Sequence, residues 1–138
     1  MILVHVVPLH SSQNRLRLSW LESIDYKKAM EKRCYNFNYL HKALENSNQL
    51  KPDIGSEFVP MCYPYLTDRG SILKKNLIEN KVYAGTYWPN VSKWLQSKNT
   101  FEVYLQNNLI PIPIDQRYDQ YSMNRIINLV LDNKNSNV

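Results

Sequence analysis

Few residues in this chain are able to support metal or nucleophilic chemistry, and they do not form a recognisable site. The three histidines, His5, His10 and His41, have none of the spacings of common metal-binding motifs. Cys34 and His41 share an expected helix, but seven residues along a helix correspond to about 10 Å, whereas a thiol–imidazole pair needs about 3 Å. The 3 glycines are isolated, so no glycine-rich phosphate loop is present. We therefore expect no catalytic residue and no metal site in this chain.

The segment from Tyr83 to Asn90 is richer in side chains that recognise ligands. It reads as a strand that ends in Tyr87, Trp88 and Pro89. Such an end brings two large rings to a sheet edge, where a ring can contact a ligand and its polar tip can form a hydrogen bond. The alternative is that both rings simply pack in the core or at its rim. The segment taken alone favours that simpler interpretation.

A second segment of interest runs through residues 109–118. An apolar strand interrupted by two prolines emerges there into Asp115, Gln116 and Arg117, just before the last expected helix. The planar guanidinium of Arg117 is suited to pair with a carboxylate or another anion. The alternative is a structural salt bridge with Asp115 or Asp119, and the residues alone favour it.

The elements that position these segments follow from the spacing of apolar residues. Asp25 is a suitable N-cap for a helix that ends near residues 46–48. One face of this helix is apolar except for Arg33, and it carries Tyr26, Met30, Phe37, Leu40 and Leu44. A last helix, before the polar tail, has an equally clear stripe of Met123, Ile126, Ile127, Val130 and Leu131.

Between these two helices the pattern alternates. Residues 58–66 predict an irregular strand, because Pro60 and Pro64 interrupt it. A helix capped by Thr67 or Asp68 and stopped at Asn80 follows, then a strand over 82–88, short helical turns over 94–105 and a strand over 109–114. The residues expected to face inward on that middle helix are Ile72, Leu73, Leu77 and Ile78.

This order predicts an α+β fold: a small sheet of about three or more strands, with helices packed on one face. Residues 16–132 form the expected domain, with an unassigned segment at 1–15 and a polar tail at 133–138. The opposite face of the sheet is then left to solvent or to a partner. We accordingly expect an exposed apolar patch and a tendency to self-associate.

Composition restricts the classes of protein that remain. The 138 residues fit one domain, and 43% hydrophobic and 12% aromatic residues are enough for a core. Two cysteines are too few for a disulfide framework, and no apolar run is long enough to cross a membrane, so a reducing cytoplasmic location is expected. The net charge of +5 admits acidic small molecules or nucleic acid as partners without choosing between them.

Several of these segments together resemble one family. They are Arg33 to Leu40, Val59 to Pro64, Thr86 to Val91 and Ile112 to Tyr118, in that order. They look like the C-terminal small domain of the DegT-type sugar aminotransferases, and the resemblance covers roughly residues 16–132. Tyr87-Trp88-Pro89 followed by Pro113-Ile114-Asp115-Gln116-Arg117-Tyr118 is its most specific part.

The resemblance implies a fold type I enzyme, usually dimeric, that uses pyridoxal phosphate. Such enzymes move an amino group from an amino acid such as glutamate to a keto-sugar, often linked to a nucleotide. The lysine that holds the cofactor belongs to a large N-terminal domain in this family, and no segment here resembles it. The resemblance therefore implies substrate-side roles for Tyr87, Trp88 and Arg117, and no cofactor-binding residue. Tyr87 stands where some relatives carry histidine, and tyrosine does not titrate near neutral pH.

Three functional hypotheses follow. The first is the substrate-side domain of an aminotransferase, inactive alone and partnered by the missing large domain or by itself. The second is a remnant domain that serves as a protein-interaction or ligand-binding module. The third is nucleic-acid binding, which would weaken steeply with salt. It ranks lowest, because no stacking motif with interleaved basic residues is present.

Overall fold

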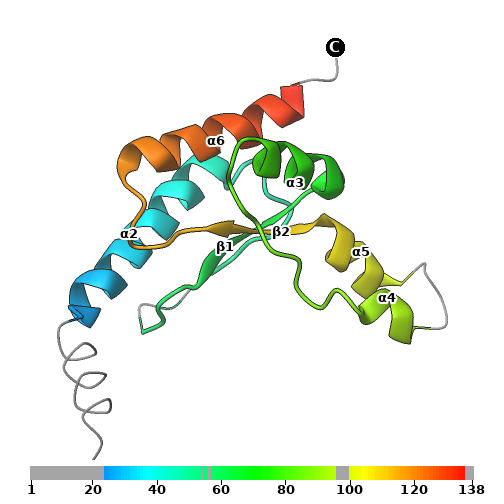
Figure 1. Ribbon diagram of the computed structural model, residues 1–138, viewed down its shortest axis with the longest axis horizontal. Coiled ribbons are helices and arrows are strands. Elements are labelled where there is room, and N and C mark those ends of the chain that lie inside the picture. The colour runs from blue at the N-terminus through cyan, green and yellow to red at the C-terminus, as the bar shows by residue number, and fades with distance from the viewer. Residues whose placement is uncertain (1–23, 54, 56, 96–99, 136–138) are drawn as a thin grey trace, which may run out of the picture.

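The computed structural model describes residues 24–53, 55, 57–95 and 100–135, and these form an α+β fold (Figure 1). The α+β class predicted from the sequence is confirmed. The elements in chain order are α2 (Tyr26–Leu44), β1 (Cys62–Leu66), α3 (Gly70–Glu79), α4 (Val91–Trp94), α5 (Phe101–Asn108), β2 (Leu109–Pro113) and α6 (Gln120–Asn135). The segment at 1–15, with His5 and His10, lies outside the described residues. Helix α6 continues to Asn135, which lies within the segment expected as a polar tail, and residues 136–138 lie outside the described residues.

Helix α2 begins where the capping residue predicts. The Asp25 carboxylate accepts a hydrogen bond from the Lys28 backbone N–H at 2.9 Å, which satisfies one of the free donors of the first turn. Phe37, Leu40 and Leu44 are buried, but the N-terminal half of the helix leaves its apolar residues exposed. Helix α2 therefore contributes to the core only through its C-terminal half, and Figure 1 shows its other half extending away from the body.

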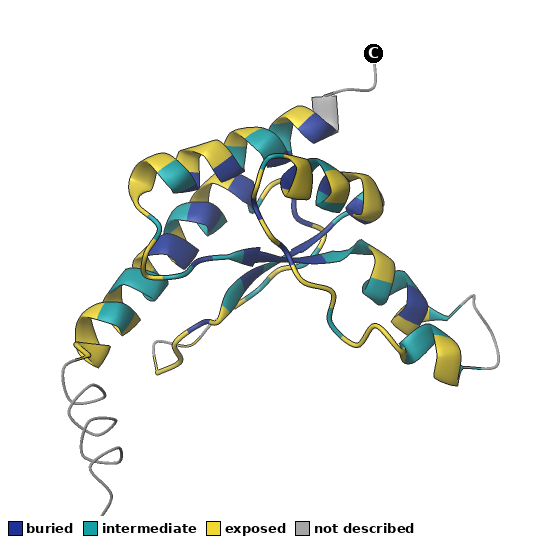
Figure 2. Ribbon diagram, viewed as in Figure 1, coloured by how far each residue is buried: buried dark blue, intermediate teal, exposed yellow. Residues whose placement is uncertain are grey.

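The two strands pair antiparallel in a register that separates their two faces. Tyr63 lies opposite Ile112 and Tyr65 opposite Ile110, and all four side chains are buried. Helices α2, α3 and α6 cover this face (Figure 1), and each of them carries buried residues (Figure 2). The core cluster combines these positions with apolar residues of the three helices: Phe37, Leu40, Leu44, Leu73, Leu77, Met123, Ile126 and Val130.

The strand expected over residues 82–88 does not form, and the sheet of the described chain has two strands rather than three or more. The outer edge of β2 explains this. Pro64 lies directly opposite Pro111. Since proline has no N–H, the two residues must form a non-hydrogen-bonded pair, in which the backbone nitrogens point away from the partner strand. Pro111 and Pro113 therefore occupy outward-facing positions of β2 where a third strand would need N–H donors.

The outer edge of β1 is also covered, by the side chain of Asn48 in the turn after α2. Buried Asn48 accepts a hydrogen bond from the Leu66 N–H at 2.9 Å and donates one to the Pro64 carbonyl at 2.9 Å. The Gln49 N–H donates to the Leu66 carbonyl at 3.1 Å. The turn after α2 thus takes the place of a neighbouring strand.

Helix α3 follows the prediction in part. Leu73 and Leu77 are buried, but Ile72 and Ile78 are 54% and 43% exposed, so their predicted inward orientation is wrong. The helix is short and packs mainly against α6, so that only one residue per turn is covered. The helix stops at Asn80, as predicted, and the left-handed backbone that follows is at Lys81, with φ of 60°.

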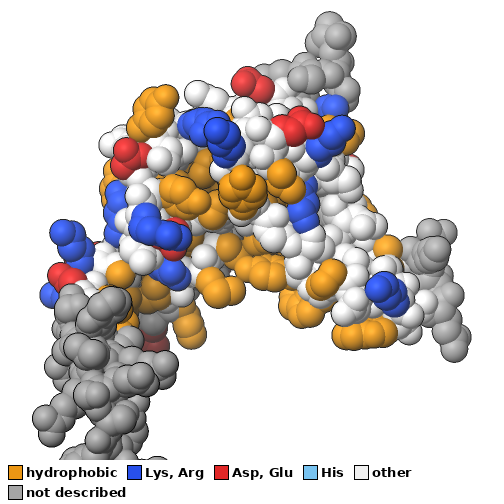
Figure 3. Space-filling model, viewed as in Figure 1, with side chains coloured by type: hydrophobic (Ala, Val, Ile, Leu, Met, Phe, Trp, Pro, Cys, Tyr) orange, Lys and Arg blue, Asp and Glu red, His pale blue; other side chains and the backbone are white. Residues whose placement is uncertain are grey.

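The face of the sheet opposite the three helices borders a hollow. Figure 3 shows hydrophobic side chains gathered along this hollow, which lies between the exposed half of α2 and the α4–α5 pair. The large hydrophobic residues exposed in the segments nearby include Phe58, Val59, Met61, Tyr83, Trp88, Trp94 and Phe101. The predicted exposed apolar surface is therefore present. In the described part of the chain, no helix is long and apolar enough to span a membrane.

Candidate functional site

The segment between α3 and α4 lies against the body of the domain and turns its aromatic residues outward. Val82 and Ala84 are buried, whereas Tyr83 between them is 73% exposed. Tyr87 is half-buried, and its hydroxyl donates a hydrogen bond to the Cys62 Sγ at 3.4 Å, at the start of β1. This contact, together with burial, raises the pKa of the Tyr87 hydroxyl to about 12. Tyr87 therefore stays protonated and able to donate at every physiological pH.

Trp88 has the most unusual backbone of the segment. Its φ of 48° lies in the left-handed region, which costs a bulky residue on the order of 1–3 kcal/mol. Its indole is nevertheless 65% exposed, with a ring centroid 5.7 Å from that of Tyr87. Packing in the core is therefore excluded as the role of Trp88.

Hydrogen bonds from two neighbouring helices hold this segment in place. Lys74 of α3 donates to the Thr86 hydroxyl. Gln106 of α5 donates to the Pro89 carbonyl at 3.0 Å and accepts from the Ser92 N–H at 3.1 Å. The exposed indole is thus carried by a fixed loop.

Arg117 lies beyond the end of β2 and pairs with Asp115. Its Nε is 2.7 Å from the Asp115 Oδ1, which also accepts the Arg117 backbone N–H at 3.0 Å. The hydrogen bond from Arg117 lowers the pKa of Asp115, and the same bond raises the pKa of Arg117. The salt bridge considered as the alternative role for Arg117 is thus present, yet the Arg117 side chain remains 82% exposed.

Two residues of α2 that the sequence did not single out hold the loop around Asp115. The buried Asn36 amide donates to the carbonyls of Ile114, Asp115 and Tyr118, at 3.0–3.3 Å. Arg33 donates from Nε to the Gln116 side chain at 3.0 Å, and its Nη2 lies 3.7 Å from the Asp115 carboxylate. The signal for Arg33 was its position as the polar member of an apolar helix face. Asn36 carried no comparable signal.

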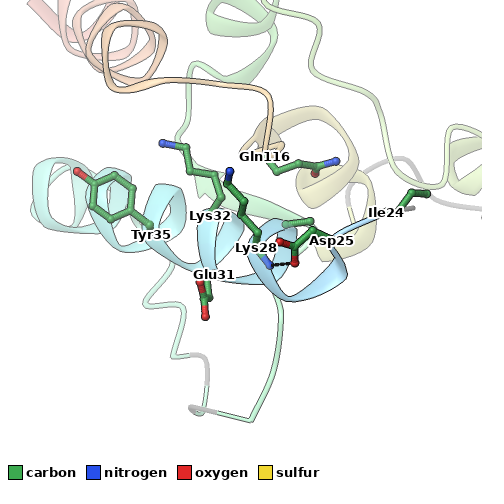
Figure 4. A pocket seen from close by; sticks show the side chains of 8 residues that line it. Ile24, Asp25, Lys28, Glu31, Lys32, Tyr35 and Gln116 are labelled. Carbon is green, nitrogen blue, oxygen red and sulfur yellow. Dashed lines mark hydrogen bonds between the residues drawn. The ribbon is translucent and has the colours of Figure 1, made fainter. Parts of the chain in front are cut away.

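A groove of about 740 Å³ lies beside this loop, along the exposed half of α2 (Figure 4). Lys28 and Lys32 project from successive turns of α2 on the side where Gln116 lies, and the Lys32 amine is 5.0 Å from the centre of the Tyr35 ring. Asp25 and Glu31 also line the groove, so its charge is mixed.

The structure thus joins two of the three predicted site residues directly. Tyr87 and Trp88 are in ring contact, and Tyr87 is bonded to Cys62, which pairs with Pro113 in the sheet. Arg117 follows Pro113 by four residues, and its side chain pairs with Asp115. Across the described ranges, no three His, Cys, Asp or Glu residues gather as metal ligands.

Comparisons with known proteins support a relation at the level of the fold. No protein-family model matches the chain, and no curated protein matches its sequence. A solved structure of a DegT DnrJ EryC1 StrS aminotransferase from Brucella abortus is similar over 86% of this chain, with a TM-score of 0.61 and 15% sequence identity. The likeness is one of fold. This chain spans about a third of the length of that aminotransferase, 33% of it.

The Cys62–Tyr87 contact makes a prediction that can be measured in the isolated chain. Substituting Cys62 with alanine removes the first cause of the raised pKa of Tyr87, so this pKa should fall from about 12 toward the ordinary tyrosine value of about 10. Titration of the labelled Tyr87 ring by NMR measures it. Tyr83 is the internal control, because a shift of both residues would indicate a general loosening and would contradict the assignment.

Proposed function

We propose that this chain is the C-terminal, substrate-side part of a cytoplasmic, pyridoxal-phosphate-dependent aminotransferase that acts on a nucleotide-linked keto-sugar, with an amino acid as donor. The observation that carries the proposal is the exposed, backbone-strained Trp88 on a fixed loop, in a domain whose fold matches part of an aminotransferase. Strained backbone persists mainly at functional positions. The two cysteines are free thiols, in keeping with a reducing compartment.

The described residues of this chain do not fit the cofactor itself. A site for pyridoxal phosphate needs an enclosed lysine together with a carboxylate beside the pyridine nitrogen. The described lysines are exposed or half-buried, and the amine of Lys74 is bonded to Thr86. We therefore assign no catalytic residue to this chain, and place the cofactor in the remaining two thirds of the enzyme.

In this proposal Tyr87 and Trp88 contribute binding rather than chemistry. The Trp88 indole offers an apolar face to the sugar or base, and the neighbouring Tyr87 ring supports it. Arg117 is a cation suited to an anionic part of the substrate. The large domain is proposed to cover the hollow opposite the helices, where hydrophobic side chains are exposed. Alternatively, a second copy of this chain covers the same surface.

The proposal predicts that the source genome encodes a lysine-bearing large part beside this chain, and the test is to produce the chain with and without that part. We expect glutamate-dependent amination of a keto-sugar nucleotide only when both parts are present. Replacing Trp88 with alanine should then raise KM by roughly three- to tenfold, since an aromatic contact is worth about 0.5–1.5 kcal/mol. Absence of a gene for such a part, or a pair that binds no cofactor, would refute the enzyme hypothesis.

The second hypothesis, a non-catalytic module, is tested by binding measurements on the same purified chain. Binding of a nucleotide-sugar to the chain alone, without any large part, would favour a ligand-binding module. The exposed apolar surface also fits a protein-interaction module, which would bind a partner in the absence of any sugar.

A further inference from the structure

The guanidinium of Arg117 is hydrogen-bonded at its Nε edge, and its Nη edge faces solvent. Its Nε donates to the Asp115 carboxylate, whereas its two Nη groups make no hydrogen bond within the described part of the chain. These Nη groups carry four of the five N–H donors of arginine and form its planar fork. With the side chain 82% exposed, the fork is presented to solvent.

The carboxylate that anchors Arg117 is itself held in place. Asp115 is only 23% exposed, and its carbonyl accepts a hydrogen bond from the buried Asn36 amide at 3.0 Å. Arg33, whose Nη2 lies 3.7 Å from the other carboxylate oxygen, provides a second positive charge. Two guanidinium groups therefore share one carboxylate, and the cluster keeps a net charge of +1.

We propose that Asp115 is a positioning residue that holds Arg117 as a preset fork for an oxyanion of the substrate, either a phosphate or a carboxylate. The inference rests on the proposed function and assigns a chemical class to one end of the substrate. A side chain already held at Nε loses less rotamer freedom when its Nη edge binds an anion. Two parallel N–H···O bonds to the anion are stronger and more selective than a point charge.

Electrostatics and positioning predict opposite results for one substitution. If Asp115 acts only through its negative charge, D115N makes the surface more positive and strengthens anion binding. If Asp115 positions Arg117, D115N replaces a charge-assisted hydrogen bond with a weaker neutral one. The Arg117 side chain is then held less firmly, and anion binding weakens by about tenfold. The sign of the change separates the two roles.

The experiment is an NMR titration of the full chain with inorganic phosphate and, separately, with glutamate. We expect the Nη signals of Arg117 to shift on addition of one anion while its Nε–H signal stays at the position typical of a hydrogen bond to carboxylate. R117Q should abolish the response, and D115N should weaken it and move the Nε–H signal. R125Q is the matched control, because Arg125 is an exposed arginine anchored to the Asn80 carbonyl and should leave the titration unchanged.

The outcomes also identify the source of the oxyanion. A response to phosphate points to a phosphorylated or nucleotide-linked substrate, and a response to glutamate points to the amino donor. If neither anion shifts Arg117 more than Arg125, or if D115N binds anions more tightly, the inference is wrong. Because this titration needs no large domain, its failure is distinct from failure of the co-expression test, which concerns the proposed enzyme.

Discussion

Replacing Gly70 with alanine is expected to destabilise the domain by about 3 kcal/mol, or to prevent its folding. An added Cβ at Gly70 would lie 2.3 Å from the Asn108 Cα and 2.7 Å from both the carbonyl carbon and the oxygen of Asn108. These are backbone atoms, so no side-chain rotation relieves the clash. The Gly70 N–H also bonds to the Asn108 side chain, which joins the start of α3 to the end of α5. Urea-induced unfolding measures the change.

Gly85 provides the matched control. No atom lies within 4 Å of a Cβ added there, and its φ is not positive, so alanine should change the free energy of unfolding by less than about 0.5 kcal/mol. Equal effects of the two substitutions would show that the approach of α3 to Asn108 does not stabilise the fold.

The second large effect is expected for Asn36→Asp. The Asn36 amide is buried and faces three carbonyl oxygens, and its own Oδ1 has no hydrogen-bond partner among the described residues. A carboxylate at position 36 would face three carbonyl oxygens and have no N–H to donate to them. We therefore expect the free energy of unfolding to fall by about 3–5 kcal/mol at neutral pH. Chemical unfolding across a range of pH measures it.

The loss should depend on pH in a defined direction. Burial raises the pKa of the introduced carboxyl in the folded state above the unfolded value of about 3.9. The destabilisation is therefore small below pH of about 4, where both states are protonated, and grows as the pH rises through the folded pKa. Asn124→Asp is the control, since Asn124 is exposed and accepts a hydrogen bond from the Tyr39 hydroxyl that a carboxylate also accepts. A similar loss in both variants would contradict the role given to Asn36.

The sequence predicted those elements whose pattern of apolar and capping residues is local to the element. Helices α2 and α6 have long apolar stripes, and Asp25 marks the start of α2, so both were predicted near their true positions. The strand over 82–88 failed because pairing depends on the donors of a distant strand. Pro111 and Pro113 were visible in the sequence, but only the register with β1 shows that they face outward.

The candidate site shows the same division. The residue types and the family resemblance predicted substrate-side roles for Tyr87, Trp88 and Arg117, and these roles stay predictions. What the structure adds is that the Trp88 indole is exposed and not part of the core. The left-handed backbone of Trp88 has no local sequence signal. It lies between Thr86 and Pro89, which accept hydrogen bonds from Lys74 of α3 and Gln106 of α5. Asn36 was missed for a related reason, since its three acceptors lie some 80 residues away in the chain.

The closed edges of the two-stranded sheet also bear on how the chain behaves when it is produced alone. Open strand edges are the usual starting points for fibril growth, because they template the addition of further strands. Here Pro111 and Pro113 remove donors from one edge, and Asn48 occupies the other. Association of isolated copies should therefore proceed through the hydrophobic side chains of the hollow and stay reversible. We therefore expect the described part of the chain to expose an apolar surface without offering an open strand edge for fibril growth.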